Sequence, residues 1–270
     1  MSLKPLALFS GSLLLSVLLS GCFGGAVAPQ GEVGSVGACN PLPCIKIEFD
    51  APPELPQSVP APVRDRITRD VSAVLYEPLD EEATEVSPGA LKQQLAARLT
   101  EATAAGVSDA PVDWALSRRA ALLFTTGEIA TVAITDSGYL GGAHGFNDRT
   151  LLCFDLRDGK RLTLTELVSD SSRGILQRIA EAEFRRVKGI AAERPLQEEG
   201  LFLGEGEPFK VSENFGVVEG GLLLHYNPYD IGPFSMGETD LLLPREVVVP
   251  LLKGGETAAV ALFGSLDPQG

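Results

Sequence analysis

Both histidines of the chain lie in two irregular segments that could carry chemistry. Residues 136–145 read DSGYLGGAHG and residues 225–237 read HYNPYDIGPFSMG, and together they hold three of the four tyrosines. A histidine and a carboxylate can transfer protons near neutral pH, because imidazole titrates there. The candidate catalytic pair is therefore His144 with Asp230, with His225 as an optional third member.

The motifs that would specify such chemistry are missing from both segments. The glycines lack the pattern of a phosphate-binding loop, and no histidine or cysteine spacing indicates a metal, so we predict no metal and no cofactor. No serine-nucleophile motif is present either. The favoured interpretation is structural: the glycines allow positive φ and His144 bonds a neighbouring loop. Aromatic rings can still form a recognition surface, and the binding candidates are Tyr139, His144, Tyr226, Tyr229 and Asp230.

The N-terminus has the features of a bacterial lipoprotein signal. Lys4 precedes an apolar run over residues 6–19, which is shorter than the ~20 residues of a membrane span and fits a cleaved secretory signal. Leu19-Ser20-Gly21-Cys22 resembles the bacterial lipobox. We predict cleavage before Cys22 and a lipid anchor on it, against the alternative of an ordinary signal with an incidental cysteine. The predicted location is the cell envelope, facing the periplasm or the exterior. Phe23 replaces the Asp of inner-membrane retention, so the outer membrane is expected in a Gram-negative organism.

Net charge restricts the classes of molecule that the protein could bind, and the cysteines indicate its disulfide state. The formal net charge is −14, and removal of Lys4 with the signal would make it −15. Such a surface repels phosphate backbones, so we expect no nucleic-acid partner, and cationic partners are favoured. In an oxidising envelope Cys39 and Cys44 could close a short disulfide loop. Cys153 lies in an apolar strand and is expected to be a buried free thiol.

The elements around these segments predict an α+β fold, with antiparallel sheets packed against helices in two small, intimately associated subdomains. Helical spacing indicates helices near residues 63–74, 91–99 and 175–187. Alternation indicates strands near 45–49, 114–124, 129–135, 150–156, 161–164, 215–218, 222–226 and 239–243. The predicted organisation is a signal peptide (1–21), a tether (22–44), an N-terminal subdomain (45–110) and a C-terminal domain (111–262).

Two groups of residues carry a resemblance to a known family. The first is Gly141-Gly142-Ala143-His144 with the later Phe154-Asp155-Leu156 and Gly159-Lys160, and the second is Pro228–Phe234 with Gly237. In this order they resemble the domain of unknown function shared by RsiV-type lysozyme-sensing anti-sigma factors and PdaC-type peptidoglycan deacetylases. The resemblance runs from Trp114 to Leu252, and Ile45–Leu99 resembles the companion domain that precedes it.

The resemblance implies a compact α+β envelope domain, which binds lysozyme in RsiV. It implies no active site, because the deacetylase chemistry of PdaC-type proteins lies in a separate domain. No second transmembrane segment follows Cys22, so anti-sigma signalling is not expected. The favoured hypothesis is a non-catalytic lipoprotein that binds a protein or cell-wall ligand, such as a lysozyme-like protein or peptidoglycan. The alternatives are a cell-wall enzyme using His144 and Asp230, and a structural or assembly lipoprotein whose partner is an envelope protein.

Overall fold

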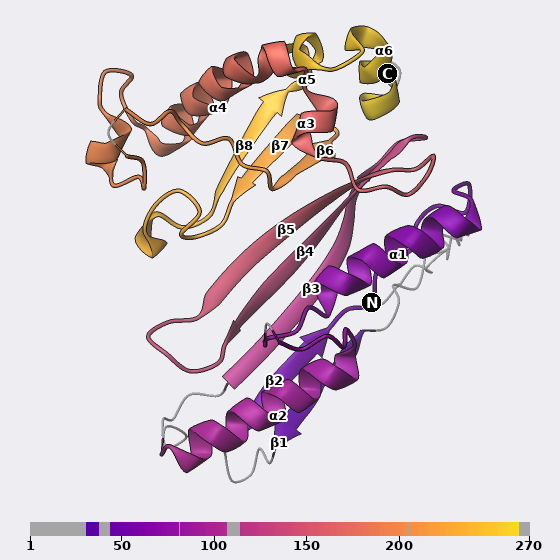
Figure 1. The fold of residues 1–270 in the computed structure, drawn as a ribbon, viewed down its shortest axis with the longest axis vertical. Coiled ribbons are helices and arrows are strands. Elements are labelled where there is room, and N and C mark those ends of the chain that lie inside the picture. Colours follow the sequence, from indigo (N-terminus) through magenta and orange to yellow (C-terminus); the bar gives the residue numbers. More distant parts are fainter. Residues whose placement is uncertain (1–30, 38–43, 81, 107–113, 205, 265–270) are drawn as a thin grey trace, which may run out of the picture.

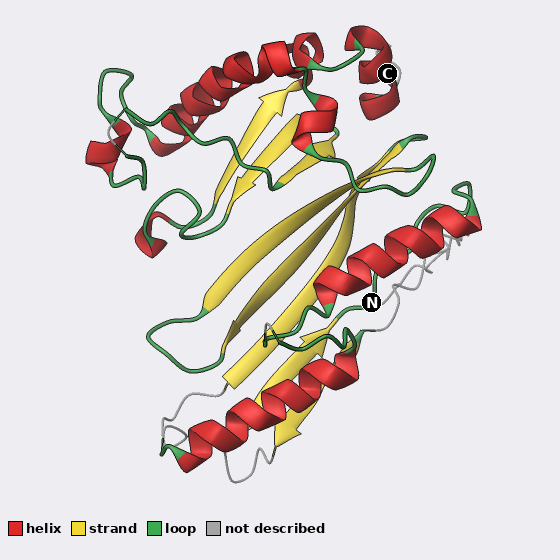
Figure 2. Ribbon diagram, viewed as in Figure 1, coloured by secondary structure: helices red, strands yellow, loops and turns green. Residues whose placement is uncertain are grey.

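The computed structural model describes residues 31–37, 44–80, 82–106, 114–204 and 206–264. Its strands form two sheets, one of five strands in the order β1-β2-β3-β4-β5 and one of three in the order β6-β7-β8. Helices cover one face of each sheet, and the two sheets lie against each other (Figures 1 and 2). The predicted α+β class is confirmed.

The larger sheet contains the first five strands in chain order. Their bounds are β1 Glu32–Gly37, β2 Cys44–Phe49, β3 Trp114–Thr125, β4 Ile129–Tyr139 and β5 Phe146–Asp155. All neighbours are antiparallel except β2 and β3, which are parallel. The pair β2–β3 is parallel because the two helices between these strands return the chain to the same end of the sheet.

Helices α1 (Ala61–Leu75) and α2 (Pro88–Ala104) cover one face of this sheet (Figure 1). Val63, Ile67 and Val71 of α1 recur at helical spacing and pack against β4 and β5. Each such side chain contributes roughly 1.5–3 kcal/mol on full burial. Ser87 caps the N-terminus of α2 by accepting a hydrogen bond from the Ala90 amide at 3.0 Å.

The second layer is built from the C-terminal half. Its strands are β6 Phe215–Val218, β7 Gly221–Tyr226 and β8 Thr239–Pro244, and its helices are α3 Leu164–Leu167, α4 Arg173–Lys188, α5 Arg245–Val248 and α6 Gly255–Phe263. Four 3-10 turns complete it, at Asp170–Ser172, Leu196–Glu199, Phe234–Met236 and Val249–Leu251. Leu176, Ala180 and Phe184 of α4 are buried against this sheet. Gly189, in the left-handed conformation with φ 69°, ends α4.

The two sheets are joined by side-chain hydrogen bonds to exposed strand edges. The buried Thr131 hydroxyl of β4 donates to the Val217 carbonyl of β6 at 2.6 Å. Asn214 accepts from the Leu151 amide at 2.7 Å and donates to the Arg149 carbonyl at 2.6 Å. The two Asn214 bonds satisfy backbone groups on the edge of β5, the last strand of the larger sheet, and so fix β5 near the C-terminal layer.

The structure differs from the expected elements of the chain at three places. The tether over residues 22–44 contains β1, which pairs with β2 despite its short, glycine-containing sequence. The boundary between 45–110 and 111–262 separates β2 from β3, although these pair within one sheet. The strand expected at 161–164 is reduced to a single bridge between Phe154 and Arg161, because Thr163 caps α3 directly afterwards.

The described part of the chain contains no helix long and apolar enough to cross a membrane. The predicted signal peptide and Cys22 lie outside the described residues, as does Cys39. Cys44 is buried and disulfide-bonded, and its predicted pairing with Cys39 stays a prediction. Cys153 is free and buried, as expected.

Candidate functional site

The two irregular segments meet on one side of the molecule. The first connects β4 to β5 and the second connects β7 to β8 (Figure 1). His144 from the first stacks on Phe234 from the second, with ring centroids 3.9 Å apart and planes 21° from parallel. Its Nε2 lies 3.3 Å from the Tyr229 hydroxyl. We call His144, Tyr229 and Phe234 the exposed aromatic cluster.

This cluster is accessible to solvent. Tyr229 is 56% exposed and Phe234 is 37% exposed, and His144 is exposed as well. The Tyr229–Phe234 ring centroids are 5.8 Å apart, within the range of aromatic pairs. Three neighbouring rings at a loop surface form a patch with apolar faces and polar tips, which suits recognition of another molecule.

The backbone at Tyr229 is strained. Its φ is 73°, the one positive value at a non-glycine residue among those described. A bulky side chain in this region costs of order 1–3 kcal/mol and persists where the surroundings fix it. Here Asn227 and Asp230 close the turn: the Asp230 amide donates to the Asn227 carbonyl at 3.1 Å. The Asn227 amide donates to Asp230 Oδ2 at 2.7 Å.

His225 lies in a different environment from His144. It is fully buried, with Nδ1 2.6 Å from Asp240 Oδ1 and Nε2 2.9 Å from Asn227 Oδ1. Arg149 donates to the other oxygen of Asp240 at 2.9 Å. Burial alone would raise the pKa of Asp240, but the His225 hydrogen bond and the charge of Arg149 outweigh it and lower that pKa.

Carboxylates border the cluster. Asp148 and Asp230 are exposed, and burial of part of the Asp148 carboxyl, together with the Asp230 charge, raises the pKa of Asp148. Glu238, also exposed, lies 3.6 Å from Arg149. The cluster therefore has an acidic margin.

The structure does not bring all of the predicted site residues together in one site. Among the described residues, His144 and Asp230 share no hydrogen bond, because the Asp230 carboxylate holds its own turn and His144 bonds the Gly145 carbonyl at 2.7 Å. The Tyr139 hydroxyl donates to Gly142 within its own loop at 2.9 Å. Tyr226, also a binding candidate, is 2% exposed and lies in the core.

Tyr226 is a structural residue of the C-terminal core. Its hydroxyl donates to the Lys210 carbonyl at 2.9 Å and accepts from the Ser212 amide at 3.0 Å. Burial raises the pKa of this hydroxyl far above its usual range. Its ring packs near Phe184 and Phe209. Tyr226 thus ties the segment before β6 to β7.

Sequence reasoning missed the partners of His225. Asp240 and Asn227 were not singled out, and Arg149 was not considered. The available signal was strand register, because His225 and Asp240 face each other on β7 and β8. The described residues contain no group of histidine, cysteine and carboxylate side chains that could hold a metal ion.

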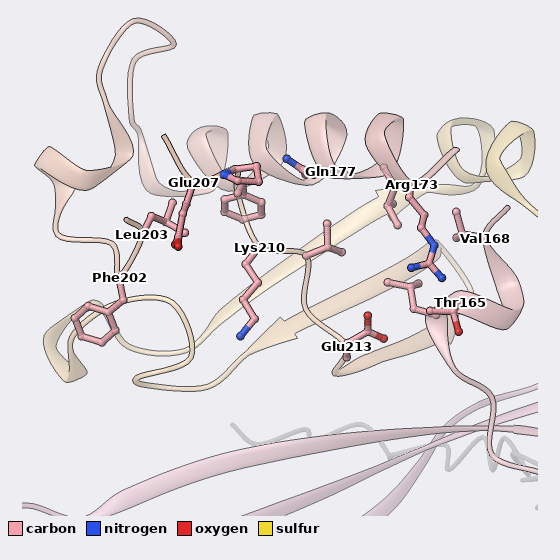
Figure 3. Close-up of a pocket in the computed structure, with 14 residues that line it drawn as sticks. Thr165, Val168, Arg173, Gln177, Phe202, Leu203, Glu207, Lys210 and Glu213 are labelled. Atoms are coloured by element: carbon pink, nitrogen blue, oxygen red, sulfur yellow. The ribbon is translucent and has the colours of Figure 1, made fainter. Parts of the chain in front are cut away.

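A groove of about 630 Å³ lies elsewhere in the C-terminal layer, between α4 and the segment before β6 (Figure 3). Its inner wall includes Leu176 and Phe209, and its rim carries Arg173, Lys210 and Glu213. The volume is in the range of small-molecule sites. The rim has both signs of charge, so its electrostatics favour no single class of ligand.

The C-terminal half matches a known family of unknown function. Residues 165–246 match the model of DUF3298, described as a protein of unknown function. The matched region includes Tyr229 and the His225–Asp240 pair, whereas His144 lies before it. A search of curated proteins gave no match.

Two solved structures share the fold. A DUF3298 family member from Bacteroides fragilis NCTC 9343 is 18% identical, with a TM-score of 0.65 over 86% of this chain and 94% of that chain. A DUF3298 family protein from Pseudomonas aeruginosa PAO1 is also 18% identical, with a TM-score of 0.60 over 83% of this chain and 93% of that chain. At this identity the likeness concerns the fold.

Proposed function

We propose that this protein is a lipid-anchored envelope protein whose folded part binds a ligand without catalysing a reaction. The ligand is a protein or a cell-wall component, and a cationic, lysozyme-like protein is the favoured candidate. The lipobox resemblance at Cys22 supports the anchor. The RsiV-like resemblance of the C-terminal part supports the choice of lysozyme.

The observation that carries the proposal is the exposed aromatic cluster. Tyr229 is held in a strained conformation with more than half of its surface open to solvent. A conformation that costs free energy, and leaves an aromatic ring in water, gives the fold no evident stability. Such strain concentrates at sites that bind other molecules, and tyrosine is a common anchor of protein interfaces.

The acidic margin favours a cationic ligand. Asp230 follows Tyr229 directly in the chain, and Asp148 interacts electrostatically with Asp230. Both carboxylates are exposed, in a chain with a net charge of −14. Complementary charges at the rim of an interface accelerate association and suppress partners of like charge. A basic enzyme such as lysozyme meets this requirement.

A non-catalytic role fits the contacts of His144. A general base needs a partner that orients its ring, and His144 contacts a backbone carbonyl and the Tyr229 hydroxyl instead of a carboxylate. Its face is covered by Phe234 at 3.9 Å. These contacts suit a packing role within the cluster.

The test measures binding of lysozyme to the immobilised protein by surface plasmon resonance at low and high salt. Tyr229→Ala and Phe234→Ala are each expected to raise Kd about 30-fold, the ~2 kcal/mol of a central aromatic anchor. Asp148→Asn is expected to slow association at low salt and to have less effect at high salt.

Val260→Ala is the matched control, because Val260 is 49% exposed on α6, away from the two loops (Figure 1). Its Kd should equal that of the unmodified protein. Absence of lysozyme binding at low salt would contradict the lysozyme ligand. Retention on purified peptidoglycan, lost in Tyr229→Ala, would then assign a cell-wall ligand to the same surface. Equal losses in Val260→Ala would contradict the site.

A further inference from the structure

We infer that His225 is a positioning residue for the exposed aromatic cluster. Its ring donates hydrogen bonds from both nitrogens, and this pair of bonds holds the turn that carries Tyr229. The effect on ligand binding rests on the proposed function, whereas the hydrogen bonding of the ring does not.

The orientation of the Asn227 amide determines the role of His225 Nε2. Asn227 Oδ1 accepts from the Arg149 amide at 2.7 Å, and Asn227 Nδ2 donates to the Arg149 carbonyl at 3.2 Å. Rotating the amide by 180° would place donor against donor and acceptor against acceptor. The atom 2.9 Å from His225 Nε2 is therefore an oxygen, so Nε2 must carry the proton.

The carboxylate of Asp240 determines the role of Nδ1. The pKa of Asp240 is lowered, so this group is an ionised acceptor. Its Oδ1 lies 2.6 Å from His225 Nδ1, while its Oδ2 takes a hydrogen bond from Arg149. An ionised carboxylate only accepts, so Nδ1 donates. An imidazole that donates from both nitrogens is an imidazolium.

The charged groups around the ring are predominantly anionic. Asp240 on β8 and Glu238, which precedes β8, face the ring at 2.6 and 3.9 Å. Asp148 on β5 interacts electrostatically with His225 and with Asp230 of the turn. Arg149 on β5 is the opposing cation and is paired with Asp240. Three nearby carboxylates and one arginine leave an excess of negative charge, which a cationic imidazole balances.

The hydrogen bonds continue from the ring to the cluster. Asn227, held by His225 through its side chain, closes the turn with Asp230 through its backbone amide and carbonyl. Tyr229 lies within that turn at φ 73°. Loss of one ring proton would bring a nitrogen lone pair against an oxygen acceptor, either Asn227 Oδ1 or the Asp240 carboxylate. The Asn227 side chain would then keep its two bonds to the Arg149 backbone but lose the one to His225, so the turn that presents Tyr229 is expected to be held less firmly.

The test uses the fact that the chain has two histidines. Comparing the untagged protein with His144→Gln by two-bond ¹H–¹⁵N correlation assigns the two imidazoles. His144→Gln, which retains His225 alone, is then titrated while the ring nitrogens and the backbone amides of Asn227 and Asp230 are followed. We expect both His225 nitrogens to be protonated while the turn is intact, and the turn amides to shift with the same midpoint as the ring. A ring that stays doubly protonated wherever the protein is folded also supports the inference.

Two results would overturn it. One is a singly protonated His225 ring with the turn amides in place, and the other is turn amides that stay unchanged while the ring titrates. The amide of Ala259, buried in α6, serves as the reference that should not follow this titration.

A second variant tests the link from the ring to the turn without altering His225. Asn227→Ala leaves His225 and Asp240 paired and removes the link to the turn, together with the two hydrogen bonds between the Asn227 side chain and the Arg149 backbone. We expect it to keep the Nδ1 proton signal and to weaken binding by about tenfold or more, toward the effect of Tyr229→Ala. Unchanged binding in Asn227→Ala, with Tyr229→Ala impaired, would refute the positioning role. A doubly protonated ring in a protein that binds no ligand would refute the proposed function and leave the hydrogen-bonding assignment standing.

Discussion

Two buried threonines allow a sharp test of what joins the two sheets. Thr131 on β4 is 0% exposed, and its hydroxyl donates to the Val217 carbonyl of β6 at 2.6 Å. Thr239 at the start of β8 is 3% exposed, but its hydroxyl has no hydrogen-bond partner among the described residues. The same replacement, threonine by valine, therefore removes a hydrogen bond between the sheets at one position and an unsatisfied polar group at the other.

The expected effects have opposite signs. Thr131→Val leaves the buried Val217 carbonyl without this donor, which costs about 1–3 kcal/mol. The added methyl also takes the place of an oxygen 2.6 Å from that carbonyl, closer than carbon and oxygen tolerate, so the upper half of the range is expected. Thr239→Val replaces an unpaired hydroxyl by a methyl worth up to ~0.8 kcal/mol on burial. Its effect is expected to lie between neutral and a gain of about 1 kcal/mol.

Urea denaturation followed by circular dichroism measures both free energies of unfolding, and the slope m checks that the same surface is exposed. In thermal unfolding, each kcal/mol corresponds to about 2–4 °C in Tm for a chain of this size. Thr131→Ser, which retains the hydroxyl, should be milder than Thr131→Val. The reasoning fails if Thr131→Val and Thr239→Val agree within ~0.5 kcal/mol, the usual limit of additivity, or if Thr131→Ser is the more destabilising of the two Thr131 variants.

Three further outcomes follow from single side chains. Hydrogen bonds from Lys160 and Thr163 lower the pKa of Glu166 from 4.5 to about 2. Its stabilising effect is therefore present above pH 4.5 and lost as pH falls toward 2, and Glu166→Gln should flatten this part of the stability–pH curve measured by urea titration. Burial raises the pKa of the Cys153 thiol, so iodoacetamide should label it only as fast as the protein unfolds, and rapid labelling under native conditions would contradict its burial. Tyr229→Gly removes the left-handed strain at φ 73° and should hold or raise the free energy of unfolding by up to about 1 kcal/mol. It should weaken binding by the cluster about as much as Tyr229→Ala, and a joint loss of stability and binding would oppose the assignment of strain.

The spacing of apolar residues along the sequence predicted the helices that bury one face. Helix α1 follows directly from Val63, Ile67 and Val71, and Ser87-Pro88 marks the start of α2. Thr163 and Glu166 form a capping box, the local pattern S/T-x-x-E at the start of α3. In each case the determining interactions lie within a few residues along the chain, where a sequence pattern is informative.

The errors concern interactions between distant segments. The sequence of β1, EVGSVG, contains two glycines and is almost wholly exposed, so alternation predicts nothing there, and pairing with β2 alone makes it a strand. The parallel pair β2–β3 depends on where two intervening helices return the chain. Neither feature leaves a local signal, because partner choice in a sheet is a property of the whole fold.

At the candidate site, too, local features were predicted and contacts between distant segments were not. Composition identified both loops and the histidines within them. It could not show that one of these histidines, His144, is exposed and the other, His225, is buried. His225 lies on β7 opposite Asp240 of β8 and is buried there. His144 lies in the loop before β5 and is exposed to solvent. Tyr226 and Tyr229, three residues apart, are likewise separated by the end of β7 into a buried side chain and an exposed one.

Two buried polar side chains, Arg118 and His225, hold irregular segments that the apolar pattern of the sequence does not predict. Arg118, 5% exposed, pairs with Asp136 at 3.0 Å and donates to the Glu77 carbonyl at 2.5 Å, so it fixes the irregular chain that follows α1. His225 does the same for the turn at Asn227. An apolar side chain at either position would fill the space but could not direct a loop, because dispersion contacts have no orientation and hydrogen bonds do. The Arg118 and His225 side chains are buried while their carboxylate partners are partly exposed, so each group couples the geometry of one loop to the layer beneath it. The exposed aromatic cluster can therefore be both strained and well ordered.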